Sequence, residues 1–287
     1  MKNINEYFQY LYSLERAGMK YDLSNITTLC KALGNPQDKF RSIHIAGTNG
    51  KGATASFTAS VLMEHGIKTG LFTSPHILKF NERIRVNGKC INNTYIKKFL
   101  EENIKLIKRI KPSFFEVNTA MAFKYFADKK VDTAVIECGL GGRLDSTNIL
   151  NPVVSAITQI DMDHMQFLGN TLREIAMEKL GIVKKRVKVI VSDNNRKLVS
   201  LFHNSITENE LLYIDDIARM KVLSNSNGNL KFTITPKGKK SITITTPLPG
   251  KYQVRNAAAG YFTVKQFFSE TGNRFQPGKF KKGISNV

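Results

Sequence analysis

The sequence of 287 residues contains no long apolar run. None approaches the roughly 20 consecutive residues that a membrane-spanning helix needs. The N-terminal stretch, residues 1–15, is polar and amphipathic, so it does not read as a secretory signal peptide. Cysteine is also scarce: Cys30, Cys90 and Cys138 are scattered and form no CxxC pair. This argues against a disulfide framework or a zinc site, and it predicts a cytoplasmic protein without a membrane partner.

Acidic residues are few as well. The chain has 23 Asp and Glu against 43 Lys and Arg, a formal net charge of +20, and the excess is greatest from Lys184 onward. A basic excess suits nucleic acid, an anionic membrane or polyanionic small substrates, although a solvated lysine-rich surface is the simpler explanation. Hydrophobic residues at 41% and charged residues at 23% exclude a disordered chain. Charge therefore leaves the function open.

Short apolar segments alternate with helical patterns through most of the chain. Amphipathic helices are expected at 4–14 and 23–33, and a hairpin is expected at 83–91 around the Asn87-Gly88 turn. Buried strands are expected at 41–46, 68–73, 132–138, 153–160 and 188–192, with helices near 53–65, 93–109 and 115–128 and another from Thr171. This alternation predicts an α/β fold with a mostly parallel, doubly wound sheet.

The pattern changes after about residue 210. Residues 230–235 and 241–246 alternate between apolar and polar side chains around a Pro-Lys-Gly turn, which predicts a small antiparallel hairpin region near 210–250. A last helix is expected at about 252–269. Residues 271–287 are polar and basic, and we expect them to be a linker after a single domain spanning 1–270.

A glycine-rich turn with a lysine, Gly-Thr-Asn-Gly-Lys-Gly at 47–52, joins the first buried strand to a helix. Glycines let backbone N–H groups point at phosphate oxygens, the helix N-terminus attracts anions, and the lysine adds a point charge. The GxxxxGK[ST] pattern is not met, because Ile45 replaces its first glycine and Gly52 follows the lysine. We predict ATP binding here, with an incidental glycine turn as the alternative.

Further stretches occur in a fixed order along the chain: TSPH at 73–76, FNERI at 80–84, FFE at 114–116, ECGLGGRLDSTN at 137–148, DH at 163–164, EKLGI at 178–182 and GKYQVRNA at 250–257. Together with GTNGKG they resemble the motifs of the folylpolyglutamate synthase/dihydrofolate synthase family of the Mur ligase superfamily. The resemblance implies an ATP-dependent amide ligase of the Mur ligase central-domain type. It would add L-glutamate to dihydropteroate or a folate through an acyl phosphate.

The resemblance also implies roles for individual residues. The nucleotide would contact Thr48, Asn49, Gly50, Lys51, Gly52, Ala53 and Asn256. Ala53 stands where the family usually has Ser or Thr, so one hydroxyl contact is missing there. Ser74, Glu137 and His164 would hold Mg²⁺, with K⁺ as a further cation. Lys179 matches the family's carbamylated lysine, so the implied catalytic set is Glu137, His164 and Lys179.

The substrate pocket implied by the resemblance comprises Ser113, Phe114, Phe115, Glu116, Leu144, Asp145 and Ser146. The Gly-Gly-Arg-Leu-Asp sequence at 141–145 resembles enzymes with dihydrofolate synthase activity, which favours 7,8-dihydropteroate without excluding folate extension. Each residue also has an ordinary interpretation. The phenylalanines suit core packing, Ser74 suits a turn, and Lys179 beside Glu178 suits a helix surface.

Family members are much longer than this chain, with a second Rossmann-like domain that closes over ATP. We therefore expect an N-terminal fragment of low activity, and a monomer. Two alternatives stay open. A cell-wall amino-acid ligase is disfavoured because only about 40 residues precede the loop. A non-catalytic ATP- or nucleic-acid-binding module would use the charge, but no nucleic-acid motif is present, so no nucleic-acid partner is expected.

Overall fold

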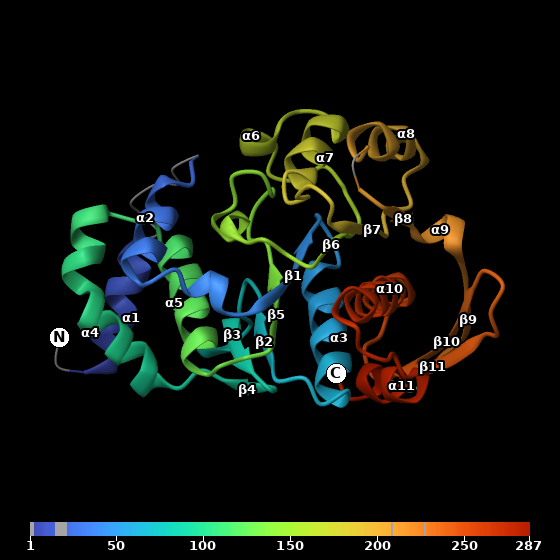
Figure 1. The fold of residues 1–287 in the computed structure, drawn as a ribbon, viewed down its shortest axis with the longest axis horizontal. Coiled ribbons are helices and arrows are strands. Elements are labelled where there is room, and N and C mark those ends of the chain that lie inside the picture. The colour runs from blue at the N-terminus through green and yellow to red at the C-terminus, as the bar shows by residue number, and fades with distance from the viewer. Residues whose placement is uncertain (1–2, 15–21, 208, 227) are drawn as a thin grey trace.

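The computed structural model describes residues 3–14, 22–207, 209–226 and 228–287. An eight-stranded sheet lies at its centre, in the order β4-β3-β2-β5-β1-β6-β7-β8 (Figure 1). Its strands are β1 Arg41–Ala46, β2 Thr69–Phe72, β3 Ile84–Val86, β4 Lys89–Cys90, β5 Thr133–Glu137, β6 Val154–Ile157, β7 Lys188–Val191 and β8 Leu211–Tyr213. The six strands β2, β5, β1, β6, β7 and β8 pair in parallel. At one edge of the sheet, β3 pairs antiparallel with β2, and β4 pairs antiparallel with β3. The predicted doubly wound α/β fold is confirmed.

Helices cover both faces of this sheet. They are α1 Ile4–Ser13, α2 Ser24–Ala32, α3 Lys51–Glu64, α4 Asn93–Ile110, α5 Phe114–Asp128, α6 Met165–Leu168, α7 Leu172–Leu180, α8 Arg196–Ser205, α9 Ile214–Ile217, α10 Gln253–Thr271 and α11 Pro277–Ser285. Helices α3 and α10 pack on one face. Helices α5, α7 and α8 contribute buried apolar side chains to the hydrophobic core on the other face. Strand β1 is buried on both faces after its first residue, as expected for a central parallel strand, and it carries the buried polar residues Ser42 and His44.

The second sheet has three antiparallel strands, β9 Ala218–Ser226, β10 Asn229–Pro236 and β11 Ile242–Thr246, in the order β11-β10-β9. The predicted hairpin corresponds to β10 and β11, and β9 was not predicted. Apolar and polar side chains alternate less regularly in β9 than in β10. Leu223 interrupts the alternation, because it has no partner on β10 where the register shifts between Lys231 and Phe232.

The expectation of a linker over 271–287 is wrong for its central part, because residues Pro277–Ser285 form helix α11. Phe280 and Ile284 are fully buried against α3 and β11. Gly283 lies so close to α3 that a Cβ there would stand 2.7 Å from Cα of Val61. Two apolar side chains four residues apart therefore anchor a segment that is otherwise polar.

Across the described part of the chain, no helix combines the length and the apolar character that crossing a bilayer requires. The three cysteines are all free: Cys30 and Cys138 are buried, whereas Cys90 is exposed on β4.

Candidate active site

The phosphate loop follows β1 and leads directly into α3. Gly50 caps this helix with a φ of 86°, in the left-handed region that favours glycine, and Lys51 is its first residue. The helix thus starts two residues earlier than the sequence suggested. The Nζ of Lys51 donates to the carbonyl of Thr48 at 3.1 Å, so the ammonium lies over the loop. The α3 N-terminus and this cation make the loop a site for an anion.

The loop is held from the neighbouring strand β6. The amides of Thr48 and Asn49 donate to the carbonyl of Gln159, at 2.7 and 3.1 Å, and the hydroxyl of Thr48 donates to the carbonyl of Asp161. Two amides of the loop are thus already bonded within the protein. The amides from Gly50 onward stay at the helix N-terminus, where a phosphate would accept from them.

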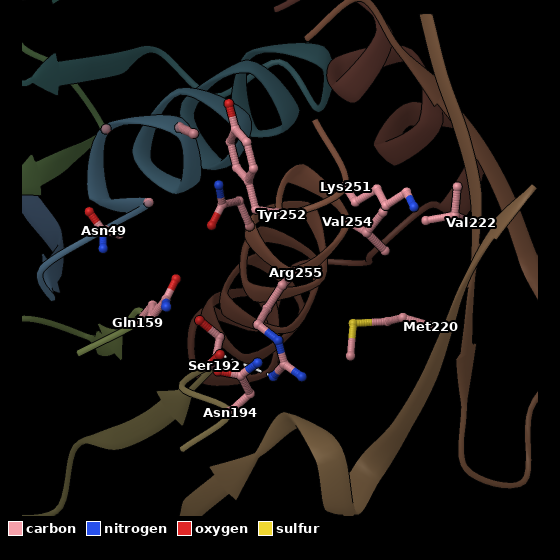
Figure 2. A pocket seen from close by; sticks show the side chains of 14 residues that line it. Asn49, Gln159, Ser192, Asn194, Met220, Val222, Lys251, Tyr252, Val254 and Arg255 are labelled. Atoms are coloured by element: carbon pink, nitrogen blue, oxygen red, sulfur yellow. Dashed lines mark hydrogen bonds between the residues drawn. The ribbon is translucent and has the colours of Figure 1, made fainter. Parts of the chain in front are cut away.

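A cavity of about 840 Å³ opens beside the loop. It is lined by Asn49, Gly50, Gly52, Ala53, Gln159, Ser192, Asn194, Met220, Val222, Lys251, Tyr252, Val254, Arg255 and Asn256 (Figure 2). Five of the seven residues predicted to bind nucleotide belong to this set. Asn256 comes from α10, far along the chain, and its Oδ1 would stand 2.3 Å from a Cβ at Gly50.

Arg255 is a cavity residue without a signal in the sequence. Figure 2 shows it beside Ser192, whose carbonyl accepts from its guanidinium at 3.1 Å. The guanidinium also forms an ion pair with Asp215 at 2.8 Å, so Arg255 ties α10 to the residue after β7 and to α9. The cavity residues that follow strands could have been predicted from the sequence, because ligands of open α/β sheets bind beyond the carboxyl ends of the strands. Residues Gln159, Ser192 and Asn194 follow such ends.

Glu137 ends β5 and is 3% exposed. Burial raises the pKa of its carboxyl to about 7, against the backbone hydrogen bond from Ser74 and the charge of Lys51, which lower it. The Ser74 amide donates to Oε2 at 2.9 Å, and a Cβ at Gly52 would stand 3.4 Å from the same oxygen. Glu137 therefore accepts a hydrogen bond from Ser74 and lies close to Gly52 in the first turn of α3.

The predicted metal ligands are brought together in part. A carboxylate and a hydroxyl are hard oxygen ligands, and the buried carboxylate of Glu137 forms no ion pair within 4.0 Å in the described part of the chain. Ser74 and Glu137 therefore fit Mg²⁺. His164 lines the same second cavity as Ser74 but is half exposed and lies 3.6 Å from Asp163. Over the described ranges, no three His, Cys, Asp or Glu side chains converge on one point.

Lys179 is buried on α7 at 2% exposure, so its interpretation as a surface lysine is wrong. Its Nζ donates to the carbonyl of Gly47 at 3.0 Å. Burial, together with the nearby charge of Lys51, lowers the pKa of this amine to about 8. A neutral amine, which is a nucleophile, is therefore accessible near physiological pH.

The second cavity, of about 880 Å³, gathers every predicted substrate residue: Ser113, Phe114, Phe115, Glu116, Leu144, Asp145 and Ser146. Ser113 and Glu116 form a capping box at the start of α5. The Oε1 of Glu116 is buried without a hydrogen-bond partner among the described residues, which leaves one acceptor free for a ligand. Arg83 was missed as a lining residue; its guanidinium lies 5.3 Å from the ring centroid of Phe114.

A buried polar chain supports the wall of this cavity. His44 on β1 is fully buried and contacts Thr147 Oγ1 at 2.8 Å and Cys138 Sγ at 3.1 Å through its Nε2. Because Nδ1 has no partner among the described residues, a proton on Nε2 leaves no buried donor unsatisfied. Nε2–H then donates to Thr147, whose hydroxyl donates to Asp145. The carboxylate of Asp145 also accepts from the amides of Leu140 and Thr147.

This architecture has clear counterparts among known proteins. The family described as "Mur ligase middle domain" matches residues 45–264. The folylpolyglutamate synthase of Lacticaseibacillus casei is 34% identical over 293 residues, covering 99% of this chain and 68% of the enzyme. The dihydrofolate synthase/folylpolyglutamate synthase of Bacillus subtilis is 38% identical over 251 residues, covering 84% of this chain and 58% of that protein.

Solved structures agree. The apo form of L. casei FPGS superposes with a TM-score of 0.89 at 33% identity, covering 99% of this chain and 71% of that one. An FPGS–AMPPCP–folate complex gives a TM-score of 0.90 at 34% identity, covering 99% and 72%. This chain belongs to the folylpolyglutamate synthase/dihydrofolate synthase family of Mur ligases. It spans between about three fifths and seven tenths of the length of these relatives.

Proposed function

We propose that this chain carries the nucleotide-binding part of an ATP-dependent ligase that joins L-glutamate to 7,8-dihydropteroate or to a folate. The observation that carries the proposal is the position of Glu137 at the end of β5. Its Oε2 accepts from the amide of Ser74, a residue of the second cavity, and lies 3.4 Å from the place that a Cβ on Gly52 of the first cavity would take. A buried carboxylate near both a phosphate site and a pocket for a flat aromatic ligand suits transfer of a phosphoryl group between two ligands. The relatives named above include a complex with both an ATP analogue and folate.

In the proposed reaction, a carboxylate oxygen of the pterin substrate attacks the γ-phosphorus of ATP, and ADP leaves. The amine of L-glutamate then attacks the carbonyl carbon of the acyl phosphate, and inorganic phosphate leaves as the amide forms and a proton is released. The amides from Gly50 to Ala53 would bind the phosphates, and Lys51 would stabilise the charge that develops on their oxygens. Asn256 would orient the nucleotide from α10.

Ser74 and Glu137, with His164 from the far wall of the second cavity, are the residues that would hold Mg²⁺. The ion, when bound, would shield the phosphate charges from the incoming carboxylate. Glu137 must be ionised to serve as a ligand, and its raised pKa of about 7 makes that ionisation sensitive to pH. Binding of K⁺ is a further expectation from the family.

The Lys179 amine is proposed to react with CO₂, forming an N–C bond and releasing a proton to give a carbamate. Its burial and its lowered pKa of about 8 supply the neutral amine that this reaction needs. Incubation with ¹³C-bicarbonate should give a carbamate carbon resonance that is missing in Lys179→Gln. A resonance of equal intensity in the variant would contradict the assignment.

The decisive assay is ADP release with ATP, Mg²⁺ and L-glutamate, adding 7,8-dihydropteroate or a reduced folate in parallel. Turnover that depends on dihydropteroate supports the synthase, and turnover with reduced folate alone supports glutamate extension. A variant Lys51→Ala, assayed beside the parent, separates true turnover from contaminating ATPase. Turnover that survives unchanged in Lys51→Ala, with either substrate, would contradict the proposal.

A further inference from the structure

The three-stranded sheet β9–β11 has one face in the core and one face in solvent. Along β10 and β11 buried and accessible residues alternate strictly, so the inward side chains pack under α10 and α11. We name part of the accessible side the basic face; it comprises Arg219, Lys221, Lys231, Thr233, Thr235, Thr243 and Thr245. Figure 1 places this sheet at the end of the molecule opposite α1 and α4.

No acidic residue balances this face. Residues 217–251 contain no Asp or Glu, whereas their basic residues are Arg219, Lys221, Lys231, Lys237, Lys239, Lys240 and Lys251. None of the ion pairs between described residues involves Arg219, Lys221 or Lys231. Their charges therefore face water and one another, which disfavours the free state and favours an anionic partner.

The register of the sheet interleaves cations with hydroxyl groups. Lys221 pairs with Thr233 of β10, Arg219 pairs with Thr235, and Lys231 pairs with Thr245 of β11. Alternate residues along a strand lie ~7 Å apart and neighbouring strands ~5 Å apart, so the face is a flat array of donors. Met220 and Val222, which alternate with Arg219 and Lys221, line the nucleotide cavity, so the basic face points away from that cavity.

We propose that the basic face binds the phosphate backbone of nucleic acid, independently of the function proposed above. Lys, Arg and Thr are the side chains that contact phosphate oxygens, and a nucleic-acid strand presents closely spaced anions along its whole length. The face carries no aromatic side chain on which bases could stack, so it would contact phosphates alone, and phosphate contacts carry no sequence information. The same lack of aromatic anchors distinguishes it from a surface that inserts into a membrane interface.

The test is fluorescence anisotropy of a labelled 20-nucleotide oligo(dT) between 50 and 300 mM NaCl, with the full chain. We expect saturable binding whose logarithm of affinity falls linearly with the logarithm of salt concentration. Arg219→Glu/Lys221→Glu/Lys231→Glu should reduce that slope by about 2, because each lost contact to a single strand contributes about 0.7. Its affinity at the lowest salt should fall at least tenfold.

The matched control is Lys105→Glu/Lys108→Glu/Arg109→Glu on α4, which makes the same charge change on exposed residues at the opposite end. This control should keep most of the affinity.

Equal loss in both triple variants, or no binding by the parent at the lowest salt, would overturn the proposal. Displacement of the oligonucleotide by ATP–Mg²⁺ would assign it to the nucleotide cavity instead. Preference for vesicles containing phosphatidylglycerol over oligo(dT) would replace nucleic acid with a membrane as the partner. Melting curves of both triple variants check that they fold.

Discussion

The backbone amide of Ser74 donates a 2.9 Å hydrogen bond to Oε2 of Glu137, which joins the ends of the adjacent parallel strands β2 and β5. This contact holds the buried carboxylate beside Ser74, a residue that lines the second cavity. Ser74 belongs to the wall of the cavity around α5, and Gly52 on the other side belongs to the wall of the nucleotide cavity. A change at Glu137 should therefore affect both ligands.

Replacing Glu137 with Gln should abolish most Mg²⁺-dependent nucleotide binding without unfolding the protein. The amide keeps the shape of the carboxyl and is cheaper to bury than a charge. We expect nucleotide affinity in Mg²⁺, measured by titration calorimetry, to fall at least tenfold while the melting temperature does not decrease. Glu102→Gln, at an exposed position on α4, should change neither quantity. A Glu137→Gln protein that binds nucleotide normally would remove Glu137 from the metal site.

Gly50→Ala should damage the nucleotide cavity more than its backbone strain explains. The φ of 86° disfavours Ala, and the new Cβ would stand 2.3 Å from Oδ1 of Asn256. We expect a loss of about 1–3 kcal/mol in the free energy of unfolding and at least a tenfold loss of ATP affinity. Gly66→Ala is the control, since its φ of 84° is nearly the same but nothing lies within 4 Å of its Cβ. Equal ATP affinity in the two variants would contradict the contact with Asn256.

Gly139→Ala should close the second cavity selectively. Its Cβ would stand 2.4 Å from Cζ of Phe115, so this ring must move within the cavity that it lines. Binding of dihydropteroate or a folate should weaken about tenfold, with ATP binding unchanged. Phe115→Ala in the same background should relieve the clash, so the two changes should be non-additive in ligand affinity. Additive effects would show that the ring and the glycine act separately.

His44 should impose a pH dependence on stability. Burial, aided by the charge of Lys184, lowers its pKa to about 3, so below about pH 6.5 the unfolded chain takes up a proton that the native chain refuses. The free energy of unfolding should therefore fall by up to about 1.4 kcal/mol per pH unit between pH 6.5 and 3, and this contribution should be constant above pH 6.5. His44→Gln should flatten that part of the curve measured by urea unfolding. The exposed control His203→Gln should keep the curve of the parent, and a His44→Gln curve as steep as the parent's would contradict the assignment.

The sequence predicted the inner strands of the central sheet well because they are short, buried on both faces and rich in apolar residues. Residues 134–136 of β5 are all apolar, β1 is apolar after Ser42 except for His44, and the phosphate loop follows β1 directly. The edge strand β8 was not predicted. Helix α11 could not be predicted in the same way. Its burial depends on Gly283 meeting Val61 of α3, a contact between residues more than 200 positions apart that no local pattern encodes.

In the candidate site, too, some residues could be placed from the local sequence, whereas others depend on contacts with distant segments. The loop and Glu137 follow the apolar strands β1 and β5, so their positions at the strand ends could be expected. Arg255 could not be assigned from its own helix, because its role depends on the carbonyl of Ser192 and the carboxylate of Asp215. Burial of Lys179 likewise results from the approach of the Gly47 carbonyl from a distant strand end.

The distribution of the thiols has a practical consequence for spectroscopy. Cys30 and Cys138 are buried, and burial raises the pKa of both thiols, whereas Cys90 is exposed on the hairpin strand β4. A maleimide dye should therefore label the native chain at Cys90 alone, without any engineered substitution. With a fluorescent ATP analogue as the acceptor, energy transfer from this single dye at the edge of the sheet would measure the fraction of protein that has bound the ligand. No residue of the sequence would have to be replaced.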